Sequence, residues 1–211
     1  MFGARFHVGG PESTAYPFYK REPVSNVIDR VGLDRTLADL AEAAGADLRE
    51  DHTVVSVDER DDRVVVEASL GDGGTERFES RMVAGCDGPT SRVRRALDLP
   101  EPDELLHGVL GFDDEADGGD YVDVHLTAPT FFAWRIPRGE AGVEYGLAAP
   151  PSADVSARFD RLTDAYGATT DHRCSGAIPV GPPARTTSDR GFLIGDAAAQ
   201  TKPFTGGGIL Y

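Results

Sequence analysis

The chain has 211 residues, of which 40% are apolar and 27% are charged, a composition typical of a globular domain that excludes disorder, collagen and a solenoid. Its 36 acidic residues against 21 basic ones give a formal net charge of −15, so the chain would repel a phosphate backbone and nucleic acid is not an expected partner. Only Lys20 and Lys202 are lysines, and an acidic, lysine-poor surface indicates a halophilic source, although a GC-rich genome that favours arginine codons explains the same bias.

The first predicted elements are short strands followed by one helix. Residues 2–24 mix glycine, proline and aromatic residues, which predicts strands with turns at residues 9–11 and around Pro17. Val27 and Ile28 predict the end of a strand. Leucine and alanine then recur at helical spacing over residues 33–44, which predicts an amphipathic helix that ends at Gly45.

A hairpin and a turn between a strand and a helix follow. The β-branched runs 53–57 and 63–68 predict a hairpin, and the glycine-rich turn 71–74 leads into a further strand, residues 77–83. Residues 82–84 then run into the turn Gly85-Cys86-Asp87-Gly88, after which a helix is expected from Pro89 to about Leu97.

The second half of the chain predicts an antiparallel region and a final strand. Residues 105–179 contain alternating strands, such as 121–126, 131–136 and 143–148, and one short helix near 153–166. Residues 190–196 predict a buried strand that ends in Gly195-Asp196, with a glycine-rich turn at 205–208. This order predicts an α/β (α+β) fold, in which a discontinuous nucleotide-binding domain carries an inserted antiparallel substrate region.

No segment predicts a membrane span or a secretory signal. The apolar stretches reach about four residues, far below the roughly 20 that a spanning helix needs, so the cytoplasm is the expected location. Cys86 and Cys174 are far apart and have no second ligand nearby, which predicts neither a metal site nor a disulfide, and we expect both to be buried thiols. The five histidines show no metal spacing, and no serine or cysteine has a convincing base partner for hydrolysis.

Two strand-end turns carry the candidate ligand chemistry. A carboxylate at the C-terminal end of a parallel strand accepts hydrogen bonds from sugar or ribityl hydroxyls, which makes Asp196 a candidate. The glycines at 206–208 would begin a helix whose N–H groups face a pyrophosphate or a flavin ring. The same argument places Asp87 near a phosphate or ribose, although a simple helix cap explains Asp87 equally well. The nearby Arg92, Arg94 and Arg95 fit a solvated helix face.

These residues resemble the geranylgeranyl reductases, FAD-dependent enzymes that share the flavin fold of the p-hydroxybenzoate hydroxylase group. The resemblance spans nearly the whole chain, and its last piece is most similar to the archaeal digeranylgeranylglycerophospholipid reductases. Four pieces carry it in the family's order: Val27-Ile28-Asp29-Arg30 ahead of Leu33-Asp34 and Leu37-Ala38; Gly85-Cys86-Asp87-Gly88 with Ser91, Val93 and Arg94; Phe132-Ala133-Trp134-Arg135-Ile136-Pro137 with Gly146; and Gly195-Asp196-Ala197-Ala198 through Lys202-Pro203 to Gly206-Gly207-Gly208-Ile209.

The resemblance implies a partial FAD/NAD(P)-binding βαβ-type domain with an inserted antiparallel substrate domain. It divides the chain into residues 1–25, strands of the substrate-side sheet; 26–98, the middle of the FAD-binding domain; 99–187, the substrate domain; and 188–211, the Gly-Asp segment of the FAD-binding domain. The implied cofactor is FAD. Its implied contacts are Arg30 and the backbone at Val54 on the nucleotide half, Asp87 and Gly88 at a phosphate or ribose, Asp196 at ribityl or ribose hydroxyls, Gly207, Gly208 and Ile209 at the flavin end, and Pro203 beside the ring.

The resemblance also implies a substrate and a reaction. Phe132, Trp134 and Pro137 match a family motif whose aromatic residues line the cavity for an isoprenoid chain, although Phe132 and Ile136 replace its Tyr and Phe. For Trp134 a role in the core is the alternative. The implied reaction is reduction of geranylgeranyl double bonds in archaeal-type membrane lipids by hydride from the flavin. The lipid substrate implies possible peripheral membrane contact, and NADPH and ferredoxin are both open as the reductant. An aromatic-ring monooxygenase of the same fold and a non-catalytic fragment are the alternatives.

One departure from the family concerns the ends of the chain. The family begins with a strand, a Gly-x-Gly-x-x-Gly turn and a helix, and no such run occurs before Val27. The chain also stops soon after Gly208. The expectation is a reductase truncated at both ends, without the first Rossmann βαβ unit and with weak or absent FAD binding.

Overall fold

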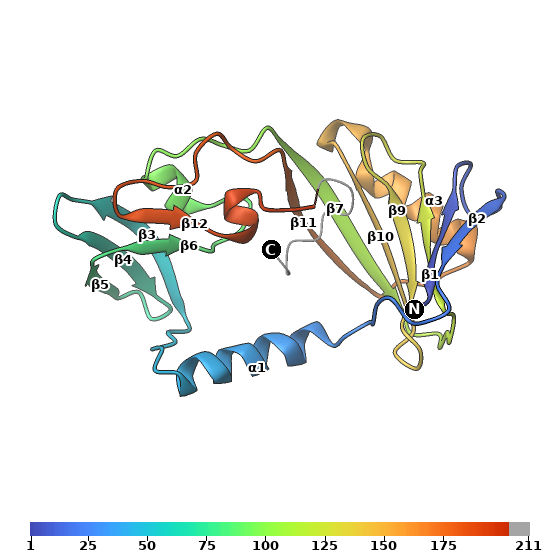
Figure 1. Ribbon diagram of the computed structural model, residues 1–211, viewed down its shortest axis with the longest axis horizontal. Helices are drawn as coiled ribbons and strands as arrows, with labels where there is room; N and C mark the ends of the chain where they lie inside the picture. Colours follow the sequence, from blue (N-terminus) through green and yellow to red (C-terminus); the bar gives the residue numbers. More distant parts are fainter. Residues whose placement is uncertain (203–211) are drawn as a thin grey trace. The chain divides into compact units, whose positions relative to one another are not determined.

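The computed structural model describes residues 1–202 and confirms a mixed α/β fold with several sheets (Figure 1). The chain forms two compact units. Residues 1–27 and 105–178 form the large-sheet unit, and residues 28–104 with the segment from Pro179 onwards form the small-sheet unit. The roles assigned above to four parts of the chain stay predictions.

The large-sheet unit is built on seven strands. Their order in the sheet is β11-β7-β10-β9-β8-β1-β2, with β1 parallel to β8 and with antiparallel pairs joining β2 to β1, β8 to β9, β9 to β10 and β10 to β7. The strands are β1 (Gly3–His7), β2 (Ala15–Tyr19), β7 (Glu104–Asp113), β8 (Tyr121–His125), β9 (Ala133–Pro137), β10 (Val143–Ala149) and β11 (His172–Val180).

One helix packs on one face of this sheet. Helix α3 (Val155–Tyr166), preceded by a short 3₁₀ turn (Pro151–Ala153), lies against β10 (Figure 1). Its Phe159 is fully buried in a core that includes Tyr145 and Leu147 of β10. Asp154 begins the helix by accepting a hydrogen bond from the Ala157 N–H at 3.3 Å. Side chains alternate along a strand, so Trp134 and Arg135 of β9 point to opposite faces of the sheet.

The small-sheet unit contains two sheets and two helices. Strands β3 (His52–Glu59), β4 (Val64–Leu70) and β5 (Thr75–Ser80) form an antiparallel sheet, which confirms the predicted hairpin. Strand β6 (Val83–Gly85) pairs in parallel with β12 (Gly191–Leu193), and a 3₁₀ turn (Gly195–Ala198) follows β12. Helix α2 (Arg92–Ala96) follows β6, and the core joins Val57 and Val64 of the sheet to Val93 and Leu193.

The predicted helix over residues 33–44 is present as α1 (Arg30–Ala43). Asp29 caps it by accepting a hydrogen bond from the Val31 N–H at 3.0 Å, and Gly45 follows it at φ 98°. Within residues 1–202 nothing covers its apolar side, because Leu37 and Leu40 are 53% and 61% exposed.

Four local predictions differ from the structure. The predicted strand end at Val27 and Ile28 is wrong, because both residues lie in the irregular segment before α1. Pro17 lies inside β2 and not in a turn. An edge strand such as β2 tolerates a proline, because the backbone groups on its outer side pair with no neighbouring strand. The predicted strand 77–83 is divided between β5 and β6, which belong to different sheets. The predicted helix from Pro89 begins only after Ser91, whose hydroxyl accepts from the Arg94 N–H at 2.9 Å.

Both cysteines are exposed, so the expectation of two buried thiols is wrong. Cys86 lies in the turn directly after β6, and Cys174 lies on β11 at the outer edge of the seven-stranded sheet. A turn and an edge strand each leave a small side chain on the surface, whereas the prediction assumed the buried position usual for a free cysteine.

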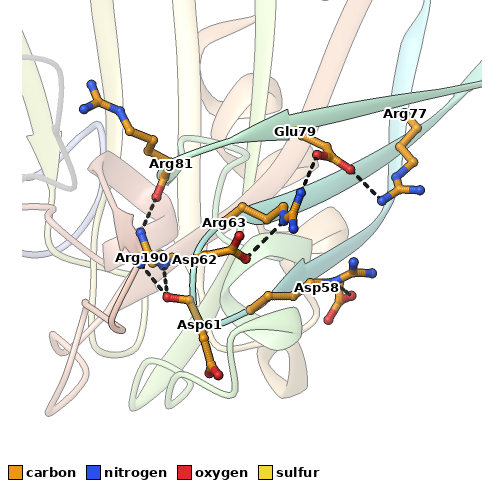
Figure 2. A network of polar contacts seen from close by, with 9 residues as sticks. Asp58, Asp61, Asp62, Arg63, Arg77, Glu79, Arg81 and Arg190 are labelled. Carbon is orange, nitrogen blue, oxygen red and sulfur yellow. Dashed lines mark hydrogen bonds and ion pairs between the residues drawn. The ribbon is translucent and has the colours of Figure 1, made fainter.

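Strand β12 is held in place by the residue that precedes it. Figure 2 shows the Arg190 guanidinium between two backbone carbonyls. It donates to the backbone carbonyl oxygen of Asp61 at 3.0 Å, in the turn between β3 and β4. It also donates to the backbone carbonyl oxygen of Arg81 at 3.3 Å, just before β6. The Arg190 carbonyl accepts from the Val83 N–H at 2.9 Å. These bonds fix β12 next to β6. The surrounding ion pairs of Arg63 with Asp62 and Glu79 lie on the surface, and each contributes little stability.

Candidate functional site

The two predicted strand-end turns lie side by side. The parallel register pairs Gly191 with Val83 and Leu193 with Gly85, so β6 and β12 end at the same edge of their sheet (Figure 1). The Ile194 N–H donates to the Gly85 carbonyl at 2.9 Å and continues the pairing into the second turn. A Cβ on Gly85 would lie 2.7 Å from the Leu193 side chain, so glycine is required for this close approach. The turn at Asp87 and the turn at Asp196 therefore share one edge of the small-sheet unit.

Asp87 is fully engaged by the helix that follows it. Its carboxylate accepts hydrogen bonds from the Ser91 hydroxyl at 2.5 Å and from the backbone N–H groups of Arg92 at 2.6 Å and Val93 at 3.2 Å. Burial opposes ionisation, but these hydrogen bonds outweigh it and lower the pKa of Asp87 below its usual value. Of the two readings left open for Asp87, the geometry matches the helix cap. Gly88, at φ +80°, adopts the left-handed conformation that this turn needs.

Asp196 has the opposite character. Its half-buried carboxylate accepts no hydrogen bond from any residue in the part of the chain that the structure describes. Burial raises the pKa of Asp196, and the positive charge of Arg30 partly offsets that effect. A half-buried carboxylate without a donor is an unfavourable arrangement that a ligand hydroxyl would relieve.

Arg94 joins the two turns, a role that we did not predict from the sequence. Its side chain is 1% exposed and donates to the Ala197 carbonyl at 3.0 Å, beside Asp196, and to the Pro89 carbonyl at 2.8 Å, beside Asp87. It also forms an ion pair with Glu101. The prediction of a solvated face holds for the exposed Arg92 and Arg95 but is wrong for Arg94. The only sequence feature that could have indicated this role is the position of Arg94 in the helical turn after the cap Ser91. That position does not distinguish a buried arginine from an exposed one.

Arg30 and Val54 occupy different positions in the same unit. Arg30 begins α1, is 60% exposed, and forms an ion pair with Asp34 at 2.8 Å. The Val54 carbonyl lies at an irregularity in the pairing of β3 with β4 and accepts a hydrogen bond from the Arg92 guanidinium at 2.6 Å. Arg92 is therefore a further candidate at this edge, because it links Val54 to the turn after β6. The predicted contacts at Pro203, Gly207, Gly208 and Ile209 lie outside the described residues.

Trp134 lies on the face of the large sheet opposite to α3. Its indole N–H donates to the Glu144 carboxylate at 3.0 Å, and its ring packs edge-on against Phe132 at 5.6 Å between centroids. A Cβ on Gly146 would lie 2.1 Å from the indole, so this glycine leaves the space that the ring occupies. Trp134 is only partly buried, so the alternative of a core residue does not describe it.

An apolar hollow of about 290 Å³ lies beside Trp134. Gly108, Leu110, Cys174 and Ile178 of β7 and β11 line it together with the indole. Pro137 does not join this hollow. It lies on the α3 side of the sheet and lines a separate polar cavity with Arg5, Asp123 and Arg135. The structure thus brings Phe132 and Trp134 together and places Pro137 apart from them.

That polar cavity contains a buried network that the sequence analysis missed. Asp123, 2% exposed, binds Arg5 through two hydrogen bonds of 2.7 Å and His7 at 3.0 Å. His125 is fully buried, and its Nε2 lies 2.9 Å from the Tyr166 hydroxyl. Burial, with a smaller contribution from His7, lowers the pKa of His125 to about 4. The sequence feature that could have indicated this network is the i, i+2 spacing of Arg5 and His7 in β1 and of Asp123 and His125 in β8, which places each pair on one face of its strand.

The comparisons with known proteins cover most of the chain. A family model described as an FAD binding domain matches residues 20–109. The chain is 30% identical to a digeranylgeranylglycerophospholipid reductase of Methanococcoides burtonii, over 88% of this chain and 49% of that protein. It is also 30% identical to such a reductase of Methanothermobacter thermautotrophicus, over 87% of this chain and 51% of that protein. The chain therefore spans about half the length of the curated relatives it matches.

The fold has a close counterpart among solved structures. A geranylgeranyl bacteriochlorophyll reductase-like protein from Thermoplasma acidophilum superimposes with a TM-score of 0.84 at 23% identity, covering 98% of this chain and 57% of that one. At this identity the likeness concerns the fold. Together with the sequence relatives, these findings confirm the predicted resemblance: the chain is similar to digeranylgeranylglycerophospholipid reductases over most of its length, and residues 20–109 match the model of an FAD binding domain.

Proposed function

We propose that the chain acts in an FAD-dependent reductase that saturates geranylgeranyl double bonds of archaeal-type membrane lipids. The observation that carries the proposal is the parallel pairing of β6 with β12, which brings Asp87 and Asp196 to one sheet edge. In open α/β sheets, ligands bind outside the carboxyl ends of the strands, which is where these turns lie. The similarity to reductases over almost the whole chain selects this function among those that flavoproteins perform.

FAD fits this edge through residues with distinct roles. Asp196 would accept hydrogen bonds from ribityl or ribose hydroxyls, since its carboxylate has no donor of its own. Arg30 would contact the nucleotide half, the backbone at Val54 and Gly88 would approach it, and Asp87 would act indirectly by holding α2 in place. Pro203, Gly207, Gly208 and Ile209 are proposed for the flavin end. When bound in its reduced form, FAD would supply the hydride for the reduction.

The hollow beside Trp134 is proposed to hold the isoprenoid chain. Its walls are largely apolar, and the hydrogen bond to Glu144 fixes the indole plane against which a methyl-branched chain packs. Phe132 extends the aromatic surface, whereas Pro137 would support β9 from the other face. We propose that residues 26–98 and 188–211 serve FAD and that residues 1–25 and 99–187 serve the substrate.

The proposed reaction takes place at a membrane surface. No helix among residues 1–202 is long and apolar enough to cross a membrane. We place the protein in the cytoplasm with peripheral contact to the membrane that holds its lipid substrate. The net charge of −15 supports a halophilic archaeon as the source, because high salt screens the repulsion among the carboxylates. NADPH and ferredoxin are both suitable as the reductant.

The cofactor role of Asp196 is tested by FAD-dependent thermal stabilisation. We expect weak binding, so FAD is titrated to high concentration. At about ten times the dissociation constant the stabilisation is about 1.4 kcal/mol, or a few degrees in melting temperature. Asp196→Ala should abolish the shift, and Asp189→Ala, which removes an exposed carboxylate of the same unit, should keep it. The absence of a shift in the wild-type chain, or an equal shift in Asp196→Ala, contradicts the assignment.

The reaction is tested by product analysis. The chain is incubated anaerobically with reduced FAD and a geranylgeranyl lipid, and the expected product gains a pair of hydrogen atoms per saturated double bond. Trp134→Ala should lower the yield. Oxygen-dependent hydroxylation of a phenolic compound, with no change in the lipid, would instead identify an aromatic-ring monooxygenase.

A further inference from the structure

Strand β2 forms one edge of the seven-stranded sheet and exposes three aromatic side chains. Tyr16, Phe18 and Tyr19 are 54%, 65% and 65% exposed. Phe18 and Tyr19 point to opposite faces, because neighbouring residues alternate along a strand, so they flank the sheet edge on both sides. A surface hollow of about 590 Å³ follows the same edge and is lined by both side chains together with Lys20 and Val24.

The backbone of this edge is poorly suited to a further strand. The Lys20 N–H donates to the Phe2 carbonyl at 3.0 Å, so the even-numbered residues of β2 bond inward to β1. The odd-numbered residues therefore face the free edge, and the central one is Pro17, which has no N–H. A proline at this position is a usual protection against strand addition. The exposed aromatic groups are consequently available to a partner that binds side chains and not backbone.

Two cations directly follow these aromatic groups, in a chain that is strongly acidic as a whole. Lys20 and Arg21, both exposed, directly follow β2. Besides Arg5, which is paired with Asp123, residues 1–27 hold the cations Lys20 and Arg21 against the carboxylates of Glu12 and Glu22, whereas the whole chain has a net charge of −15. At about 0.15 M salt, charges more than about 8 Å away are largely screened, so a surface touching this edge responds mainly to its local cations.

We propose that the β2 edge, defined as Tyr16, Phe18, Tyr19, Lys20 and Arg21, is the surface by which the chain docks on an anionic lipid bilayer. The proposal rests on the proposed function only in that a lipid substrate requires a membrane-facing surface. Aromatic rings favour the depth of lipid headgroups, and adjacent lysine and arginine side chains attract lipid phosphates. A second copy of the chain fits less well, because a symmetric contact would bring the cations of both copies together.

Flotation with lipid vesicles tests the proposal. The chain is mixed at about 0.15 M salt with vesicles of phosphatidylglycerol or of phosphatidylcholine, and the bound fraction is measured after centrifugation. We expect preferential binding to phosphatidylglycerol. The double variant Phe18→Ser, Tyr19→Ser should weaken binding at least about ten-fold through the loss of apolar contact. The double variant Lys20→Glu, Arg21→Glu should weaken it at least about 25-fold, since each of the two cations near the surface contributes about five-fold.

Matched controls change the same properties elsewhere. Leu48→Ser removes a side chain that is 50% exposed in the small-sheet unit, and Arg35→Glu with Arg95→Glu reverses two exposed charges there. Both controls should bind vesicles as the wild-type chain does. As a second measurement, Phe18→Trp should give an emission shift to shorter wavelength on vesicle addition, and Leu48→Trp should not.

Three results would overturn the proposal. These are no binding of the wild-type chain to either vesicle, equal losses in the controls, and a dimer that Phe18→Ser dissociates while vesicles have no effect. Failure here is distinguishable from failure of the proposed function, because Asp196-dependent stabilisation by FAD and saturation of the lipid use other residues. If the chain reduces lipid in detergent but does not float with vesicles, the docking proposal is wrong and the proposed function is retained.

Discussion

Replacing Arg94 with alanine should destabilise the small-sheet unit and loosen both turns at once. The change removes donors to the buried Ala197 carbonyl and to the Pro89 carbonyl, at 3.0 Å and 2.8 Å. An unsatisfied buried carbonyl costs about 1 to 3 kcal/mol, and the Pro89 carbonyl is only partly buried, so we expect a total loss of about 3 kcal/mol. Glu101 is 55% exposed and regains water, so its lost ion pair adds little.

The assay is urea unfolding followed by circular dichroism, with Arg95→Ala as the control. Arg95 lies on the same helix but is exposed, so its removal should change the unfolding free energy by less than about 0.5 kcal/mol. Arg94→Lys should lie between the two, because one ammonium group does not reproduce a guanidinium that bonds two carbonyls. A loss below about 1 kcal/mol in Arg94→Ala would refute the idea that this side chain holds the two turns together.

The other predictions concern packing, pH and salt. Gly146→Ala would place a Cβ 2.1 Å from the indole of Trp134, so we expect a loss of about 1 to 3 kcal/mol in urea unfolding and a changed tryptophan emission; an unchanged emission would contradict the packing. The pKa of His125 lies near 4 in the folded chain against 6.5 in the unfolded chain, so the unfolded state binds the extra proton as pH falls, and stability should drop by about 2 kcal/mol between pH 7 and pH 5. His125→Gln should remove that part of the pH dependence in unfolding curves measured at both pH values, and an unaltered dependence would exclude His125 as its origin. Because the net charge is −15, potassium chloride should raise the melting temperature more than sucrose of equal osmolality, and equal effects would argue against charge repulsion.

The sequence predicted those elements that local patterns determine. The β-branched runs around residues 58–62 form the antiparallel β3–β4 pair, and the leucine spacing forms α1, because period and turn chemistry act within a few residues. The two strands that end in Gly85-Cys86-Asp87 and Gly195-Asp196 were also recognisable, since a short apolar run followed by glycine and aspartate marks a buried strand and its turn.

The rest depends on contacts between distant segments, which no local pattern contains. Arg94 and Arg95 are adjacent in the same helix, and only the carbonyl of Ala197, more distant in the chain, decides that Arg94 is buried. Cys174 looked like a core residue, yet its strand lies at the edge of the sheet. The helical apolar pattern of α1 predicted burial, but Leu37 and Leu40 are exposed within residues 1–202.

The pairing of β6 with β12 has a consequence for biosynthesis. The two strands are encoded on either side of residues 105–178, the larger part of the large-sheet unit, so the ribosome releases the first strand long before its partner exists. Closing such a long loop is slow unless the intervening segment folds first and brings its own ends together. We therefore expect the inserted segment to fold earlier during translation. The nascent Val83–Gly85 segment then waits, exposed to proteases and chaperones, until Leu193 has left the exit tunnel.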